Sequence, residues 1–231
     1  MKLFLAVTLV IIAISIACSS SKSAESSAAQ VSNAPTNQPA ISPTGSATQD
    51  KTSCDLKLSQ APLIFGFKLG MTPDEVLVLF PGAKDDPEVR AKLSLPANQF
   101  GTSNFAIKPA KYENKDKFPG VNQISFNLLD GRVYNFSVRY DGPQWPHVDN
   151  FVAKFVEGKD LPPVDQWQPY VGMDNLKMLK CADFEVRVFA GGEGGNLNYV
   201  QMQDLVADKK LKERRKKALE LEQASPTPGN Q

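Results

Sequence analysis

The sequence predicts an α+β domain: an antiparallel sheet of two hairpins plus a leading strand, two short helices on one face, and a C-terminal basic helix. Helix signals begin at Thr72, and alternating apolar and polar residues follow over 121–140. The same order recurs in the second half, with a helix over 146–157 and alternation over 184–203. This recurrence predicts a pseudo-duplicated domain with both short helices on the same face.

The leading strand and the first helix are predicted within residues 64–82. Strand-forming residues occupy 64–69, and Gly70 is expected to end the strand. Thr72 is expected to cap the helix, and Glu75, three residues later, completes a capping box. The buried stripe of this helix is predicted to consist of Val76, Leu79 and Phe80.

The first hairpin is predicted over 121–140, with its turn at Asp130-Gly131. A two-residue turn would split the aromatic residues between opposite faces of the sheet. A bulged three-residue loop instead pairs Phe126 with Tyr134, so that all large side chains share one face. We therefore expect the bulged loop, which also pairs Ile124 with Phe136. The opposite face is expected to be polar and to carry Ser125, Asn127, Asn135, Ser137 and Arg139.

The remaining elements of the domain follow from weaker patterns. Residues 85–118 are expected to be irregular, apart from a short helix over 88–93. Residues 161–170 are expected to form a loop, and the second hairpin joins 184–188 to 197–203. The buried stripe of the second helix is predicted to consist of Val148, Phe151, Val152 and Phe155.

The first residues of the chain are typical of an export signal. Residues 1–17 combine Lys2 with a short apolar run, which predicts a cleaved signal peptide. The tetrapeptide that ends at Cys18, Ser-Ile-Ala-Cys, resembles the lipobox of bacterial lipoproteins, although Ser15 replaces the usual Leu. This resemblance implies a lipidated Cys18 as the mature N-terminus, and Ser19 implies sorting to the outer membrane, facing the periplasm. An ordinary secretory signal with an incidental Cys18 is the alternative.

Composition divides the remainder of the chain into three regions. Residues 18–52 are small and polar, so they are expected to form a disordered linker behind the lipid anchor. Residues 53–205 are predicted to form a single globular domain, which is long enough to bury one core. Residues 206–231 are predicted to form the basic helical segment and a disordered tail.

Two cysteines remain after Cys18, namely Cys54 and Cys181. In an exported chain they are candidates for a disulfide, because the compartments outside the cytoplasm are commonly oxidising. The alternative is a pair of separate buried thiols. The chain has no Cys-x-x-Cys motif, so a redox function is not indicated.

The charge balance argues against nucleic acid as the main partner, because the formal net charge is only +1. A local basic run near the C-terminus could contact anionic lipid or an acidic envelope protein. A solvated helix without a partner is the alternative. The run consists of Lys209, Lys210, Lys212, Arg214, Arg215, Lys216 and Lys217.

No set of residues has the spacing of a metal, cofactor or catalytic site. His147 is the only histidine, and zinc would need several His or Cys ligands. The acidic residues over 85–88 lack the spacing of a calcium loop and are expected to be solvated. Trp145, Trp167 and Tyr170 are candidates for an apolar ligand groove, or alternatively fill space between helices and sheet.

The segment Leu69–Val76, LGMTPDEV, is similar to the Leu-Gly-Met-Thr-x-x-Glu-Val signature of small envelope lipoproteins. The best known of these belong to the SmpA/OmlA (BamE-like) family of outer-membrane assembly lipoproteins. The resemblance covers about 20 residues besides the lipobox. It implies a domain of helices and antiparallel sheet with a protein-binding, non-enzymatic function.

Together these observations predict a membrane-anchored envelope lipoprotein that acts as a non-enzymatic module for binding a protein or a polymer. One alternative is a hydrolase that cleaves envelope glycans or peptides with Asp or Glu. The other is a purely structural lipoprotein. The sequence contains no constellation that names a specific ligand.

Overall fold

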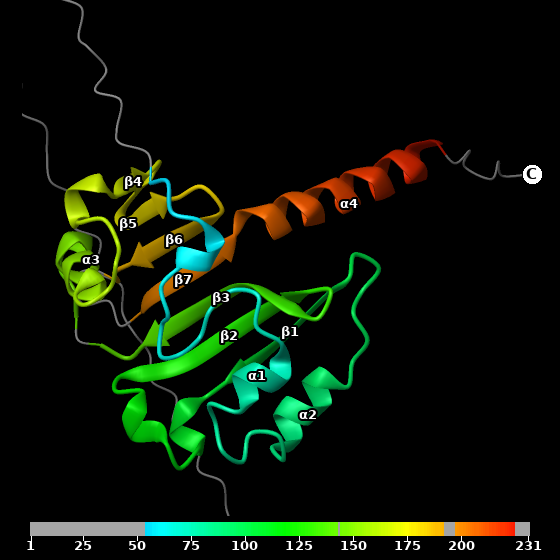
Figure 1. Cartoon of the computed structure of the whole chain (residues 1–231), viewed down its shortest axis with the longest axis horizontal. Coiled ribbons are helices and arrows are strands. Elements are labelled where there is room, and N and C mark those ends of the chain that lie inside the picture. Colours follow the sequence, from blue (N-terminus) through cyan, green and yellow to red (C-terminus); the bar gives the residue numbers. More distant parts are fainter. Residues whose placement is uncertain (1–53, 143, 192–196, 225–231) are drawn as a thin grey trace, which may run out of the picture. The chain divides into compact units, whose positions relative to one another are not determined.

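A seven-stranded antiparallel sheet forms the centre of the fold, in the order β1-β2-β3-β7-β6-β5-β4 (Figure 1). The computed structural model describes residues 54–142, 144–191 and 197–224. The predicted signal peptide, the lipidation site Cys18 and the linker therefore lie outside the described residues, as do residues 192–196 in the second hairpin. The predicted α+β class is confirmed.

The helices are α1 (Pro73–Leu77), α2 (Pro87–Leu93), α3 (Val148–Val156) and α4 (Leu205–Ala224). The strands are β1 (Thr102–Ile107), β2 (Val121–Leu129), β3 (Arg132–Tyr140), β4 (Gln168–Tyr170), β5 (Met173–Lys180), β6 (Phe184–Phe189) and β7 (Asn198–Asp204). Short 3-10 helices occupy Leu58–Gln60, Pro109–Lys111, Lys115–Lys117 and Val164–Gln166.

The strand order divides the domain into two similar halves. In the first half, α1 and α2 precede the successive strands β1, β2 and β3. In the second half, α3 precedes the successive strands β4 to β7. The last strands of the two halves, β3 and β7, pair antiparallel at the centre of the sheet. This arrangement agrees with the predicted pseudo-duplication and makes one continuous sheet from both halves.

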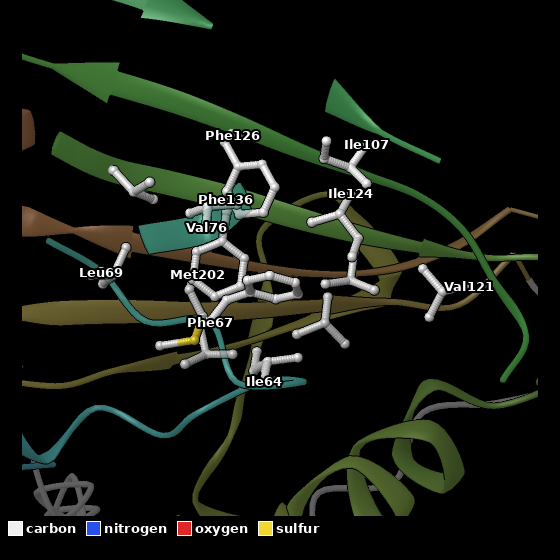
Figure 2. Close-up of a cluster of buried hydrophobic side chains, with 14 of the residues drawn as sticks. Ile64, Phe67, Leu69, Val76, Ile107, Val121, Ile124, Phe126, Phe136 and Met202 are labelled. Carbon is white, nitrogen blue, oxygen red and sulfur yellow. The ribbon is translucent and has the colours of Figure 1, made fainter. Parts of the chain in front are cut away.

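One hydrophobic core joins α1, α2 and α3 to the same face of the sheet, as predicted. Phe67 is fully buried at its centre, and its ring centroid lies 5.3 Å from that of Phe126 and 5.5 Å from that of Phe80. Figure 2 shows how side chains from the N-terminal segment, α1 and the central strands converge there. The residues labelled in it are Ile64, Phe67, Leu69, Val76, Ile107, Val121, Ile124, Phe126, Phe136 and Met202.

The capping box predicted for the first helix is present. The Thr72 hydroxyl accepts a hydrogen bond from the Glu75 amide (3.3 Å), and the Glu75 carboxylate accepts one from the Thr72 amide (2.7 Å). The helix ends at Leu77, earlier than the stripe predicts. Phe80 is nevertheless buried, because the turn after the helix carries it into the core.

The predicted leading strand over 64–69 is wrong. The chain instead reverses tightly at Phe65 and Gly66, which both have positive φ, of 53° and 87°. This turn leaves only an isolated bridge between Ile64 and Phe67. The apolar residues over 64–69 led to the prediction of a strand, but a turn also buries them, because Ile64 and Phe67 both enter the core.

The predicted register of the first hairpin is also wrong. Asp130 and Gly131 form a two-residue turn in which both φ angles are positive, 51° and 75°, as in a type I′ turn. The bulge lies inside β3: Leu128 faces Val133, whereas Asn127 faces Asn135. Tyr134 is the extra residue, and Phe126 therefore pairs with Phe136 rather than with Tyr134. With the bulge inside the strand, Val133, Phe136 and Val138 enter the core, whereas Tyr134, which was predicted to share that face, lies outside it.

Three strands lie in segments for which no strand was predicted. β1 lies within 85–118, and β4 and β5 lie between the second helix and the second hairpin. In β5 the two buried leucines, Leu176 and Leu179, are three residues apart, so they point to opposite faces of the sheet. Leu179 joins the main core, and Leu176 does not. Because a strand is recognised in a sequence by apolar residues two positions apart, the three-residue spacing of these leucines does not indicate a strand.

The predicted disulfide is present between Cys54 and Cys181, whose sulfur atoms lie 2.00 Å apart. The residues around it reinforce the connection. The Ala182 amide donates to the Leu56 carbonyl (3.2 Å), and the Leu58 amide donates to the Asp183 carboxylate (3.3 Å). The N-terminal segment of the domain is thus fastened to the β5–β6 turn.

The basic segment forms a 20-residue helix, α4, which follows β7 without a loop. The Asp204 carboxylate accepts from the Ala207 amide (2.9 Å) and caps the first turn. Leu211 is buried, whereas the second half of α4 extends past the sheet (Figure 1). Within the described residues, no helix is both long enough and apolar enough to span a bilayer.

Candidate interaction surfaces

The face of the sheet opposite α1, α2 and α3 carries polar side chains from both halves. All five residues predicted for it share this face, because Ser125, Ser137 and Gln201 are successive partners across β2, β3 and β7. Arg187 continues the same row on β6. We call this surface the polar sheet face. It comprises Asn104, Ser125, Asn127, Asn135, Ser137, Arg139, Glu185, Arg187, Phe189, Tyr199, Gln201 and Gln203.

Contacts between neighbouring strands and within β6 satisfy part of the polar sheet face. Asn127 donates its amide to the Asn135 side-chain oxygen (3.0 Å), and Glu185 forms an ion pair with Arg187. The side chains of Gln201 and Gln203 make no hydrogen bond to another described residue. Their amides, on the central strand β7, are therefore open to an external partner.

Aromatic residues and one arginine cluster at the β4–β5 end of this face. The Arg187 guanidinium lies 5.5 Å from the centroid of the Tyr170 ring. The rings of Phe189 and Tyr199 stack at 5.0 Å between centroids, with an angle of 10° between their planes. Burial raises the pKa of Tyr199 above its usual value, and the charge of Arg187 opposes this. Tyr, Phe and Arg are the residue types enriched in protein interfaces.

A groove of about 510 Å³ lies beside α3, on a different part of the surface. Its walls include Tyr140, Trp145, Phe151 and Phe155, together with the lysines Lys154 and Lys159. We call it the α3 groove. The Trp145 ring stacks on the Phe151 ring at 5.3 Å, and the Tyr140 ring meets Phe151 edge-on at 5.7 Å.

The structure separates the three aromatic residues predicted to line one groove. Trp145 lines the α3 groove. Trp167 is only 2% exposed, packs edge-on against Phe155 in the core and donates its indole N–H to the Pro162 carbonyl (3.0 Å). Tyr170 instead lies against Arg187 at the polar sheet face. Trp167 thus fills space in the core, which was the alternative reading of this residue.

Two of the three acidic residues over 85–88, Asp86 and Glu88, have structural contacts through their side chains. Asp86 caps α2 by accepting from the Glu88 amide (2.8 Å), and it accepts from the Tyr112 hydroxyl (2.9 Å). Burial raises the pKa of Asp86, but these hydrogen bonds and the nearby Lys111 outweigh it and hold the pKa below its usual value. Burial and the bond to Asp86 raise the pKa of Tyr112 to about 12. A carboxylic acid that donates a proton at neutral pH needs a raised pKa, which is the opposite of the shift at Asp86.

Most of the basic run is engaged within the domain. Arg214 and Lys210 both bind Asp130 in the β2–β3 turn. Lys212 and Lys216 form ion pairs within α4, and Arg215 lies 5.9 Å from the centroid of the Phe100 ring. Of the seven residues, Lys209 and Lys217 make neither an ion pair nor a ring contact with another described residue.

The described residues contain no group of three or more His, Cys, Asp or Glu side chains placed to hold a metal ion. His147 occupies the position before α3 without a capping hydrogen bond from its side chain. Sequence reasoning missed the Arg187–Tyr170 and Phe189–Tyr199 pairs. Alternation over 184–189 and 198–204 could have placed three of these residues on one face, but Tyr170 belongs to a strand too short to show a pattern.

Comparison of the chain with protein-family models, with curated proteins and with solved structures finds no match in any of the three.

Proposed function

We propose that the chain is a lipid-anchored lipoprotein of the bacterial cell envelope, attached to the outer membrane at Cys18. Its domain binds a partner protein through the polar sheet face. The observation that carries the proposal is the continuity of this face across both halves of the domain, with a Tyr/Phe/Arg cluster at one end. The similarity of Leu69–Val76 to the signature of the SmpA/OmlA family is a further reason to expect a protein partner.

The disulfide supports export. Disulfides persist in oxidising compartments and are rare in the reducing cytosol. Cys54 is the first described residue, and the linker proposed for residues 18–52 would enter the domain there. A domain fastened at this point stays folded while the linker lets it stand away from the bilayer.

The size of the polar sheet face supports a protein partner. Its residues lie on five adjacent strands, which at the usual spacing give a width of roughly 20 Å. The face therefore offers an area on the order of several hundred square ångströms, comparable with one side of a standard protein interface. The amides of Gln201 and Gln203 provide directional hydrogen bonds near its centre.

Site-specific photocrosslinking in the native envelope tests this function. A photoreactive residue at Gln201, in the centre of the polar sheet face, should capture a discrete protein. The same residue at Val78, which is exposed at the end of α1, serves as the control and should not. Arg187→Ala or Tyr199→Ala should weaken capture at Gln201, whereas Lys84→Ala near α1 should not. Equal capture at both positions, or capture of heterogeneous glycan alone, contradicts the proposal.

Lipidation has its own test. The intact mass of the membrane-extracted protein should correspond to a chain that begins at Cys18 with a diacyl or triacyl adduct. A soluble chain without an adduct contradicts the proposed lipidation of Cys18. The proposed function of the polar sheet face would then still be tested by crosslinking.

We also propose that the basic run contacts anionic lipid beside the anchor. Only Lys209 and Lys217 of that run make neither an ion pair nor a cation–π contact with another described residue, so their charges are available to lipid head groups. Vesicles with anionic lipid should bind the protein better than zwitterionic vesicles, and Lys209→Gln with Lys217→Gln should remove the difference. Binding that does not depend on lipid charge contradicts this contact.

A further inference from the structure

The α3 groove combines an apolar body with an ammonium group that has no ion-pair partner among the described residues and a hydroxyl that makes no hydrogen bond to them. Its volume of about 510 Å³ is that of a small-molecule site, which typically spans about 300–1,000 Å³. The stacked Trp145 and Phe151 rings and the edge-on Tyr140 ring provide most of the apolar surface. These rings present flat walls against which a slender apolar ligand can pack.

Lys159 supplies a positive charge in the groove. Its ammonium group donates to the Phe155 carbonyl at the end of α3 (2.6 Å) and lies 4.8 Å from the centroid of the Phe155 ring. No carboxylate of the described residues lies within ion-pair distance of it. Lys154 differs, because its ammonium lies 2.6 Å from the Glu157 carboxylate. An ammonium has three donors, so Lys159 retains donors for an external anion.

The Tyr140 hydroxyl is a second available donor. It makes no hydrogen bond to another described residue, and burial raises the pKa of Tyr140 above its usual value. The hydroxyl therefore stays protonated at neutral pH and can donate to an anionic oxygen. A half-buried ammonium and a hydroxyl at one apolar groove together match a ligand with a single anionic head and an apolar body.

We propose that the α3 groove binds a single-chain amphipathic carboxylate, with its carboxylate at Lys159 and Tyr140 and its chain against Trp145 and Phe151. The complementary charge of Lys159, which forms no ion pair with a described carboxylate, favours this ligand over an uncharged one. The proposal stands apart from the function of the polar sheet face, which lies on the opposite side of the sheet from α3. Failure of either one leaves the other intact.

Binding of decanoate to the purified protein, below its critical micelle concentration, tests the proposal. The chain contains two tryptophans, and Trp167 is buried, so a change in fluorescence reports mainly on Trp145. Decanoate should shift this fluorescence saturably, and isothermal titration should give the same affinity. Decyltrimethylammonium, which has the same chain but a positive head, should bind at least roughly ten-fold more weakly.

Variants identify the groups that recognise the head. Lys159→Met should weaken decanoate binding roughly ten- to hundred-fold, because it removes a charge-assisted hydrogen bond. Lys159→Arg should retain most of the affinity, which separates loss of charge from misfolding. Lys84→Met, at a lysine remote from the groove, is the matched control and should bind as the parent does. Equal affinity for the two amphiphiles, or unchanged decanoate affinity in Lys159→Met, overturns the proposal.

Discussion

Arg214 on α4 forms a two-pronged ion pair with Asp130 in the turn between β2 and β3. Nη1 lies 2.8 Å from Oδ1, and Nη2 lies 2.8 Å from Oδ2. Lys210, one turn earlier on α4, adds a contact of 2.8 Å to Oδ2, and Arg214 also donates to the Phe100 carbonyl (2.7 Å). The two residues are 84 positions apart in the sequence, so the pair fixes the C-terminal helix to the first half of the domain. A basic run that looks solvated in the sequence is thereby partly structural.

Gly101 makes this ion pair possible. A Cβ atom at Gly101 would lie 2.5 Å from Asp130 Oδ1 and 2.6 Å from Arg214 Nη1. Gly101→Ala should therefore displace the pair, destabilise the domain and speed hydrogen exchange in the first half of α4. Gly82→Ala is the matched control, because Gly82 also has positive φ but has no atom within 4 Å of the added Cβ. The control should cost only the backbone strain of roughly 1–2 kcal/mol and leave exchange in α4 unchanged. Equal effects on α4 from both variants contradict the steric argument.

The ion pair also predicts a pH dependence. Hydrogen bonds from Arg214 and then Lys210 hold the pKa of Asp130 well below its usual value. Because the folded-state pKa is depressed, the stabilisation is complete above the unfolded-state pKa of about 3.9 and is lost as the pH falls toward the folded value. Asp130→Asn keeps a side chain that tolerates the positive φ at this turn. It should unfold at lower urea than the parent at pH 7, and the difference should shrink below about pH 4. A difference that stays constant with pH would show that the ion pair contributes nothing.

Local features of the fold could be predicted from the sequence because neighbouring residues determine them. The Thr72–Glu75 capping box and the alternation in the two hairpins are of this kind. The Cys54–Cys181 pairing followed from elimination, because no other cysteines remain in the domain. The polar residues of β2 and β3 could also be assigned to one face, since that assignment needs only the period of a strand.

Features that depend on distant partners could not be predicted. The bulge lies inside β3, at Tyr134. A bulge in the Asp130-Gly131 loop would also have brought aromatic residues of the two strands together, so the sequence did not distinguish the two positions. The neighbours of Arg187 depend on the pairing of β6 with β5 and of β5 with β4, and the three-residue strand β4 has no pattern of its own. The engagement of Arg214 depends on where a 20-residue helix begins relative to the β2–β3 turn.

The disulfide should contribute strongly to stability. It closes a long segment, with the two cysteines 127 positions apart, and a link of this length stabilises by about 4–5 kcal/mol in the chain-entropy model. Reduction with dithiothreitol should therefore lower the urea midpoint of the parent. The Cys54→Ala/Cys181→Ala double variant should unfold near the midpoint of the reduced parent and should not respond to reductant. An unchanged midpoint on reduction would mean that the N-terminal segment is held by its other contacts alone.

Phe67 should be the most sensitive residue of the N-terminal segment, although it lies in a turn rather than in a strand. Its side chain is fully buried, and its ring contacts those of Phe80, Phe118 and Phe126 at 5.5, 6.1 and 5.3 Å between centroids. Phe67→Ala should lower the free energy of unfolding by about 3–5 kcal/mol, measured by urea denaturation, because it leaves a cavity where these rings meet.

Phe65, two residues earlier, is the matched control for that cavity. It is only partly buried, and it packs at the edge of the core against Phe118 and Tyr140. Phe65→Ala should therefore cost clearly less than Phe67→Ala. Similar costs for the two variants would mean that the turn at Phe65-Gly66 is held by its backbone conformation, and not by the insertion of Phe67 into the core.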